Sequence, residues 1–298
     1  MKNNVFHKPV MADEVIGFLR LKKGDKVLDA TVGCGGHASL ILEKIQPDGL
    51  LIAVDLDQKA LDISQARLGN FSTICKCVHR NFSDIDEILP GLGVDRIDGA
   101  LFDLGISSYQ IEDSGRGFSF ERNGFLDMRM DLAANTCAYD IVNRYSKHDL
   151  EAIIRDFGQE RYYRKITGFI LERRRKSPIT SSQELSWVIG RAVGGRYKKQ
   201  RIHPATRTFQ AIRIAVNDEL ENIDRALVNV VGFLKPKARL CVISFHSLED
   251  RIVKIRFKEF EKSGKGRIIT KKPMAPAACE IRENPRARSA KLRVFEGK

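Results

Sequence analysis

The chain has 298 residues, of which 43% are hydrophobic and 30% charged, so it can bury a sizeable core and is not composed like a disordered chain. No run of 18 apolar residues occurs, and the first ten residues lack an apolar segment of signal-peptide length. The six cysteines are scattered and form no C-x-x-C pair, which argues against a zinc site or a disulfide framework and favours a cytoplasmic protein.

The net charge of +13 is concentrated in two segments. Residues 161–213 carry 14 Lys or Arg against two acids, and residues 262–298 carry 11 against three, so the rest of the chain is net acidic. A basic excess confined to two segments is typical of a protein that binds a polyanion through one face. Charge alone does not separate this interpretation from two solvated surfaces.

Residues 26–103 alternate between strand-like and helix-like segments. We expect strands at 26–30, 50–55, 73–78 and 97–103, and helices at 37–45 and near 58–68. Such alternation predicts right-handed crossovers and a mostly parallel sheet in an α/β fold.

The first of these strands ends in the most informative stretch of the chain. Gly33, Gly35 and Ala38 have the G-x-G-x-x-G/A spacing, in which small residues let the backbone approach a nucleotide. Asp55 follows twenty residues after Gly35, where a carboxylate can accept hydrogen bonds from a ribose. The pattern predicts a nucleoside-cofactor site, but it does not choose between NAD and S-adenosylmethionine.

Further candidate residues lie at the predicted carboxyl ends of the strands, where ligands bind in such folds. They are Asp29, Phe82 and Asp103. Asp103 could accept a hydrogen bond from an amino group, and Ser107 and Ser108 could orient a polar ring edge. Alternatively, Asp103 caps a turn and the two serines are solvated. The acids Asp113, Asp127 and Asp131 lack a spacing that fixes them on one face, so we assign no metal site.

The strand pattern stops after residue 108 and resumes near residue 216. The intervening segment has no clear strand and favours helices at 149–157, 161–175 and 182–193. Beyond it we expect a helix near 218–234, a strand at 239–245, a helix at 247–261 and a final strand at 292–295 in an otherwise irregular basic tail. We therefore predict an α/β domain formed by residues 1–108 and 216–298, with a helical domain inserted at 109–215.

At this level of detail the chain resembles the bacterial 16S ribosomal RNA cytosine-N4 methyltransferase family (RsmH/MraW). The resemblance covers nearly the whole chain and rests on motifs in the family's order: 35–37 (GGH), 103–108 (DLGISS), 116–120 (RGFSF), 126–131 (LDMRMD), 203–210 (HPATRTFQ), 243–250 (ISFHSLED) and 284–293 (NPRARSAKLR). Two departures are Phe125, where the family usually has proline, and residues 236–238 (PKA), which replace a more typical glycine turn. Phe125 could alter a loop near the substrate.

The resemblance implies a Rossmann-like S-adenosylmethionine-dependent methyltransferase core with an inserted helical substrate-recognition domain. It implies methylation of the exocyclic amine of one cytosine in the decoding region of 16S ribosomal RNA. The partner would be this RNA, within a small ribosomal subunit or its precursor. Carried over by motif, the contacts to S-adenosylmethionine are Gly35, Gly36, His37, Asp55, Phe82, Asp103 and Gln110.

The chemistry of methyl transfer fits these positions. Aligning the amine behind the S–CH₃ bond can supply roughly 7–11 kcal/mol. An acceptor would help localise the lone pair of the amine, either Asp103, the candidate catalytic residue, or a nearby backbone carbonyl. Attack at cytosine C5 would instead need a cysteine nucleophile, commonly after proline, and no cysteine here follows proline. The target base must leave its stack, and Tyr109, Phe118, Phe120 and Trp187 are candidates to receive it.

Two rival interpretations stay open at this point. A nicotinamide-dependent oxidoreductase would share the glycine turn and Asp55 but leaves the basic segments unexplained. A non-catalytic RNA-binding ribosome-assembly factor would explain the charge but not the glycine turn. We also predict that the densest basic clusters, 173–176 and 196–201, contact RNA phosphates.

Overall fold

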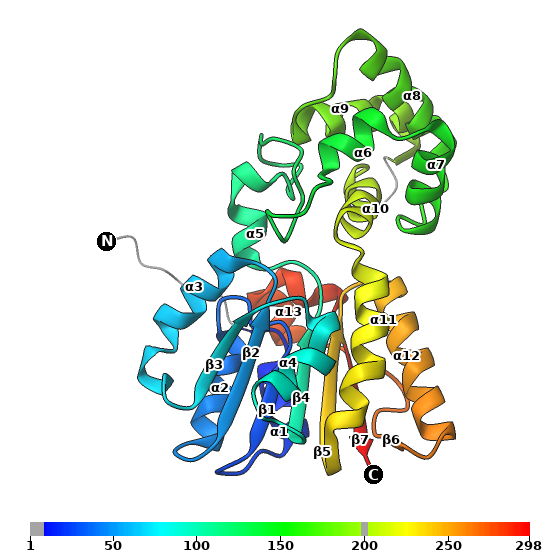
Figure 1. The fold of residues 1–298 in the computed structure, drawn as a ribbon. Coiled ribbons are helices and arrows are strands. Elements are labelled where there is room, and N and C mark those ends of the chain that lie inside the picture. Colours follow the sequence, from blue (N-terminus) through cyan, green and yellow to red (C-terminus); the bar gives the residue numbers. More distant parts are fainter. Residues whose placement is uncertain (1–8, 198–201) are drawn as a thin grey trace. The chain divides into compact units, whose positions relative to one another are not determined.

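The computed structural model describes residues 9–197 and 202–298, which divide into two compact units (Figure 1). The first unit comprises residues 1–105 and 220–298, and the second comprises residues 106–219. The second unit is therefore an insertion in the chain of the first. Each unit is described by itself.

The first unit contains a seven-stranded sheet with the order β3-β2-β1-β4-β5-β7-β6. The strands are β1 (Lys26–Asp29), β2 (Leu50–Asp55), β3 (Cys75–His79), β4 (Ile97–Asp103), β5 (Leu234–Ser244), β6 (Gly266–Ile268) and β7 (Lys291–Gly297). Strands β1 to β5 pair in parallel, whereas β7 runs antiparallel to both β5 and β6. This is the predicted α/β, Rossmann-like architecture. Strands β2 and β3 are added on one side of β1, and β4 and β5 on the other, so the strand order switches between β1 and β4.

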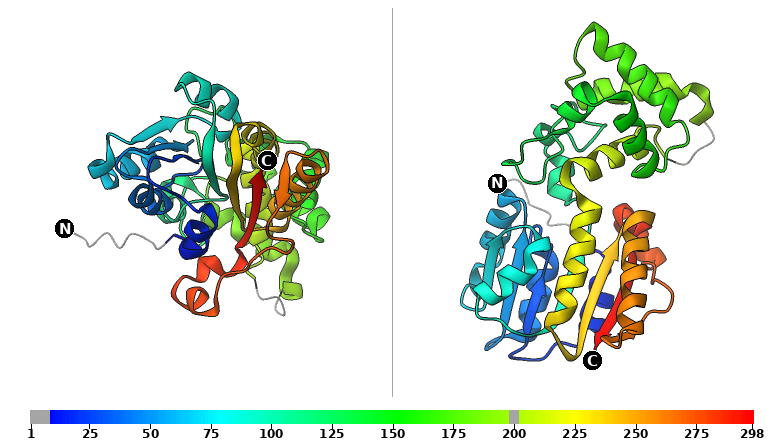
Figure 2. Two further views of the ribbon diagram at one scale, coloured as in Figure 1. Left: turned by 90° about the horizontal axis from the view of Figure 1, so that it is seen from below. Right: turned by 45° about the vertical axis from the view of Figure 1, so that its right-hand side comes forward.

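Helices cover both faces of this sheet (Figure 2). They are α1 (Ala12–Leu19), α2 (Gly36–Ile45), α3 (Gln58–Arg67), α4 (Ile85–Gly91), α11 (Glu219–Val230), α12 (Ser247–Lys262) and α13 (Ala278–Glu283). Successive strand residues point to opposite faces, so Val27 joins the core under α1 and α2 while Leu28 joins the core under α4 and α11. Burial on both faces explains why these strands are continuously apolar.

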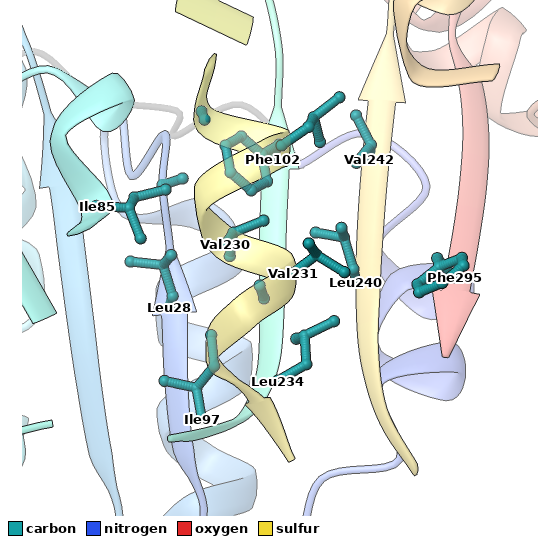
Figure 3. Close-up of a cluster of buried hydrophobic side chains, with 14 of the residues drawn as sticks. Leu28, Ile85, Ile97, Phe102, Val230, Val231, Leu234, Leu240, Val242 and Phe295 are labelled. Atoms are coloured by element: carbon teal, nitrogen blue, oxygen red, sulfur yellow. The ribbon is translucent and has the colours of Figure 1, made fainter. Parts of the chain in front are cut away.

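The core under α4, α11 and α12 is shown in Figure 3. Val230 and Val231 follow one another at the end of α11 and pack against Phe102 of β4 and Leu240 of β5. Phe295 of β7 adds its ring and lies 5.4 Å from the ring of Phe257 on α12. This packing anchors the antiparallel strand of the basic tail in the same core.

Strand β5 begins earlier than the sequence indicates. We expected a helix near 218–234 and a strand from residue 239, but α11 ends at Val230 and β5 already begins at Leu234. The register against β4 shifts between Ile97 and Gly99, and Lys237 has φ 68°. The irregular backbone at Lys237 breaks the alternating pattern, so the first half of the strand carries no recognisable signal.

The second unit is helical, with α5 (Ser108–Glu112), α6 (Ala138–Arg144), α7 (Lys147–Asp156), α8 (Tyr163–Lys176), α9 (Ser182–Val193) and α10 (Thr206–Asn217). Its own apolar core includes Ile141, Ile154, Ile170, Ile189 and Ile212, one from each of the helices α6 to α10. Because the apolar face of each helix is buried within the unit, the insertion has the organisation of an independent domain. No helix in the described part of the chain is both long and apolar enough to span a membrane.

Candidate functional site

The turn from β1 into α2 holds its glycines in the conformations that the spacing predicts. Gly33 has φ 50° and Gly35 has φ 77°, in the left-handed region that favours glycine. A Cβ atom at Gly35 would lie 3.0 Å from Ser64 Oγ. Gly35 precedes the first residue of α2 and provides no side-chain cap, so the first N–H groups of the helix are left for a ligand or solvent.

Asp55, at the end of β2, ties this turn to the neighbouring strand. Its Oδ2 accepts a hydrogen bond from the N–H of Gly33 at 2.8 Å, and its Oδ1 accepts one from the N–H of Asp57 at 2.9 Å. Burial raises the pKa of Asp55 to about 6, against the two hydrogen bonds that lower it. Each oxygen has a second lone pair, so the carboxylate can still accept from a ligand hydroxyl.

Asp29, His37 and Asp103 form a cluster at the ends of β1 and β4. His37 Nε2 lies 3.6 Å from Asp103 Oδ2, beyond hydrogen-bonding distance, and both ring nitrogens of His37 are buried without a partner in the described structure. Asp29 Oδ2 and Asp103 Oδ1 are also buried and unpartnered there. Burial raises the pKa of Asp29 to about 7, with His37 opposing this rise and Asp103 adding to it. Unpartnered buried polar atoms on three side chains mark a place built for a ligand.

The backbone holds this cluster in place. The N–H of Asp103 donates to Thr31 Oγ1 at 2.6 Å, and the N–H of Thr31 donates to Asp29 Oδ1 at 3.2 Å. Asp29 was singled out from the sequence only for its position at a strand end. Its burial, at 1% exposure, is what distinguishes it from an ordinary strand-end acid.

Phe82 lies half-buried after β3, with its ring 5.8 Å from Phe102 in an edge-to-face arrangement. It therefore contributes to the core while part of its ring stays accessible. Gln110 belongs to the other unit, where its side chain and that of Ser107 close a capping box at the start of α5. Ser107 thus caps a helix, a role that we did not predict from the sequence.

The remaining candidates have local partners. Asp113 accepts from the N–H of Gly115, Asp127 pairs with Arg129, and Asp131 accepts from the N–H of Ala133. None of the six cysteines, all of which the structure describes, forms a disulfide. Phe125 is 49% exposed and stacks on Tyr139, with ring centroids 5.6 Å apart.

One of the predicted RNA-binding clusters is largely used inside the second unit. Arg173 pairs with Glu184, and Arg174 donates to the carbonyl oxygens of Val142 at 2.8 Å and Tyr145 at 2.7 Å. Only Arg175 and Lys176 of this cluster are exposed. Arg173 and Arg174 therefore have partners within the protein, and the phosphate contacts of the 173–176 cluster stay a prediction. Residues 198–201 of the second cluster lie outside the described residues.

The charge of the site distinguishes between the two cofactors left open by the sequence. Three carboxylates, Asp29, Asp55 and Asp103, surround the glycine turn, and each disfavours a further negative charge. S-adenosylmethionine carries a sulfonium and an ammonium, whereas NAD carries a diphosphate. The cluster is complementary to the cationic nucleoside, and its unpartnered oxygens and uncapped helix N-terminus fit the polar groups of that cofactor.

Comparison with known proteins agrees with this geometry. The model of the MraW methylase family matches residues 4–298. The chain belongs to the MraW methylase family. A relative from Caldicellulosiruptor bescii, named ribosomal RNA small subunit methyltransferase H, is 47% identical over 305 residues, covering 97% of this chain and 98% of the relative. A relative of the same name from Pelobacter propionicus is 44% identical over 306 residues, with the same two coverages.

Solved structures with a detectable likeness include a putative rRNA methylase from Clostridium thermocellum, with a TM-score of 0.47 and 11% identity over 96% of this chain and 92% of that one. A putative methyltransferase from Streptococcus mutans in complex with SAH has a TM-score of 0.45 and 11% identity, covering 98% of this chain and 100% of that one.

The family assignment confirms the family predicted from the motifs. This MraW-family chain is an enzyme of the methyltransferase class with a Rossmann-like core, and S-adenosylmethionine is its methyl donor. Neither the nicotinamide-dependent oxidoreductase nor the non-catalytic assembly factor is favoured. The individual site residues stay predictions.

Proposed function

We propose that this MraW-family enzyme methylates the exocyclic N4 amine of a cytosine in the decoding region of 16S ribosomal RNA. The observation that carries the proposal is the cluster of unpartnered acids beside the glycine turn, in a chain whose relatives are named ribosomal RNA small subunit methyltransferase H. The RNA is proposed to be bound within a small ribosomal subunit or its precursor, and the reaction to take place in the cytoplasm.

Residues of the first unit have the chemistry to hold S-adenosylmethionine. Asp55 would accept hydrogen bonds from the ribose hydroxyls, and Phe82 would offer part of its ring to the adenine. The backbone from Gly35 to His37 would hold the methionine end, close to the carboxylate of Asp103. When bound, the cofactor supplies a methyl group that its positively charged sulfur has already activated. Gln110 is a further proposed contact to S-adenosylmethionine.

Asp103 is the proposed catalytic residue. Its unpartnered Oδ1 would accept a hydrogen bond from the amine of the target cytosine, which draws electron density away from the ring and toward the nitrogen. As the nitrogen forms its new bond to carbon, it must lose a proton, and Asp103 or water would accept that proton. The N–H of Asp103 donates to Thr31 Oγ1, which fixes the backbone that carries this carboxylate. No covalent intermediate on a cysteine is needed.

The second unit is proposed to recognise the RNA. It contains the whole of the basic segment 161–213, with 14 Lys or Arg against two acids. RNA is recognised at unpaired, unstacked bases, and methylation of an exocyclic amine requires the base to leave its stack. A helical unit with basic and aromatic side chains suits this role.

Two measurements test the proposal. Equilibrium binding should show affinity for S-adenosylmethionine and none for NAD. Incubation with labelled S-adenosylmethionine and 16S ribosomal RNA, either naked or in small subunits, should then yield N4-methylcytidine in the digested nucleosides. Binding of NAD instead, or a methyl group at C5 detected by mass spectrometry, would contradict the proposed reaction.

A further inference from the structure

Trp187 is the single tryptophan of the chain, and it lies on the outer side of α9 with 59% of its surface exposed. The inner side of the same helix is formed by Leu185, Val188, Ile189 and Ala192, all buried in the core of the second unit. The indole is therefore not needed to fill that core. A large aromatic side chain left in solvent exposes apolar surface that a partner can cover.

The neighbours of Trp187 on this side of α9 are polar and include a cation. Gln183, one turn earlier, and Arg191, one turn later, are both exposed. The guanidinium carbon of Arg191 lies 5.5 Å from the centre of the indole ring. Glu184, the acid of this helix, is engaged with Arg173 of α8. We call Gln183, Trp187 and Arg191 the α9 stripe.

Helix α8 packs against α9 and repeats the combination of arginine and aromatic ring. The guanidinium carbon of Arg161 lies 4.6 Å from the ring centre of Tyr162, and that of Arg164 lies 5.4 Å from the ring centre of Tyr163. The exposed charged residues of residues 161–176 are mostly basic: Arg161, Arg164, Lys165, Arg175 and Lys176, with Glu172 as the acid. This excess attracts a polyanion over several ångströms.

We propose that the α9 stripe is a stacking platform for an unpaired base of the RNA substrate, with Arg191 contacting the adjacent phosphate. The inference rests on the proposed function, because it takes RNA as the substrate. Every base presents a π-face to an exposed ring, and a neighbouring guanidinium supplies both stacking and a phosphate contact. A protein partner would need a broader apolar patch, whereas here a single apolar side chain is flanked by a polar and a charged one.

The test uses the full chain and its own fluorescence. Because Trp187 is the only tryptophan, its emission reports this position without a label. Titration with a single-stranded oligoribonucleotide from the decoding region should quench the emission. A duplex RNA of the same length should quench it far less, since its bases are already stacked. Quenching by protein components of the small subunit, with none by RNA, would overturn the proposal.

Variants separate stacking from charge. Trp187→Ala should weaken binding of the single-stranded RNA by roughly 5- to 100-fold, and Trp187→Phe should restore most of the affinity. Arg191→Gln should lower the log–log salt slope of binding by roughly 0.7. Leu132→Ala is the matched control, because Leu132 is a 48% exposed apolar side chain of the same unit, and it should leave RNA affinity unchanged. Thermal melting should confirm that each variant is folded.

Methyl-transfer kinetics distinguish failure of this inference from failure of the proposed function. Trp187→Ala should raise KM for RNA while kcat at saturating RNA and affinity for S-adenosylmethionine stay as in the wild type. If the wild type methylates the RNA but Trp187→Ala has an unchanged KM and Trp187 is not quenched, the platform is refuted and the proposed function stands. If the wild type neither binds nor methylates RNA, the proposed function fails and this inference fails with it.

Discussion

Asp55 and Asp29 are carboxylates at strand ends with a structural role and a proposed ligand-binding role. Asp55 accepts two backbone N–H groups, one of them from the glycine turn, so it organises the site as well as offering oxygens to a ligand. Asp29 is more deeply buried and keeps one oxygen unpartnered in the described structure. Both carboxylates are held where ionisation is costly, which is common at functional sites.

We predict that Asp55→Ala weakens S-adenosylmethionine binding by about 1.5–3 kcal/mol, the range for a hydrogen bond to a charged group. The loss combines the missing ribose contacts with a loosened turn at Gly33. Calorimetry should measure the affinity, and denaturation with urea should show that the variant is folded. Unchanged affinity in a folded variant would remove Asp55 from the site.

Asp29→Asn is predicted to stabilise the free enzyme at pH 8 by up to about 4 kcal/mol. Burial raises the pKa of Asp29 to about 7, above its unfolded value near 3.8, so the folded state binds the proton more tightly. The free energy of unfolding of the wild type therefore falls as pH rises from about 4 to 7, and the asparagine variant lacks this dependence.

Urea denaturation of both proteins at pH 5 and pH 8 tests this prediction. The stability difference should be clearly smaller at pH 5 than at pH 8, because only part of the window between the unfolded and folded pKa values has been crossed at pH 5. Affinity for the cationic cofactor should fall in the variant. If the difference in unfolding free energy between variant and wild type is the same at both pH values, ionisation of Asp29 does not destabilise the folded state.

The turn between β1 and α2 is the element on which the proposed cofactor site depends. Its two glycines are in the left-handed region and expose backbone rather than side chain, and the absence of a side-chain cap leaves the helix N–H groups available. Helix α8 of the second unit illustrates a different use of an element, as a scaffold that gives adjacent side chains different partners. On this helix Arg174 donates to backbone carbonyl groups, whereas the adjacent Arg175 is exposed to solvent.

Gly35→Ala is predicted to lower affinity for S-adenosylmethionine at least tenfold. The left-handed conformation costs a residue with a Cβ roughly 1–2 kcal/mol, and the added Cβ would lie 3.0 Å from Ser64 Oγ, so the turn must shift. Gly24→Ala is the matched control, because Gly24 has φ 84° but no atom within 4 Å of an added Cβ. The control should lose stability without losing affinity. Equal affinities in both variants would show that the turn does not approach the cofactor.

Arg174→Ala is predicted to destabilise the protein by about 1.5–3 kcal/mol, whereas Arg175→Ala changes stability by less than about 0.5 kcal/mol. Arg174 donates to carbonyl oxygens at the end of α6, and burial lowers its pKa, with Arg175 adding to the decrease. Arg175 is exposed. Chemical denaturation of the two variants provides the comparison, and equal losses would mean that the carbonyl contacts of Arg174 do not matter.

At the scale of the whole molecule, we propose that chemistry and recognition are divided between the two units. The acids of the cofactor site lie in the first unit, and the basic excess of residues 161–213 lies in the second. A cationic cofactor and a polyanionic substrate require opposite electrostatic surroundings, so this division avoids a conflict within one site. Part of the basic tail is also used structurally, since Arg293 and Lys291 of β7 pair with Asp250 of α12.

We predict that RNA binding falls steeply with salt while S-adenosylmethionine binding changes little. Neutralising Lys198, Lys199 and Arg201 together should lower the log–log slope of RNA binding by about 2, at roughly 0.7–0.9 for each phosphate contact. These three residues lie outside the described residues, so the prediction rests on their charge alone. Filter binding at several salt concentrations measures the slope. A full slope in the triple variant would move the phosphate contacts elsewhere, first to the 262–298 tail.

The sequence by itself determined the elements whose pattern is local. Apolar runs ending in Asp29, Asp55 and Asp103 predicted β1, β2 and β4, and the Gly33–Gly35 spacing predicted the turn, because strand periodicity and left-handed glycines leave direct signals. Helix α9 was predicted with its bounds, since Ser181 caps it and an apolar face repeats along it. The sequence motifs were sufficient to predict the family, and the family implies the class of enzyme.

Only the tertiary structure decided which side chains are free to act. Arg173 and Arg175 look alike in sequence, but one pairs with Glu184 and the other is exposed, because packing against α9 selects one side of α8. The sequence left Trp187 as one of four aromatic candidates to receive a base, and only the structure placed it on the exposed outer side of α9. Asp29 acquired its raised pKa from burial among residues distant in sequence. The burial of a side chain and its interaction partners depend on contacts between segments that are remote in sequence, so no local sequence pattern reveals them.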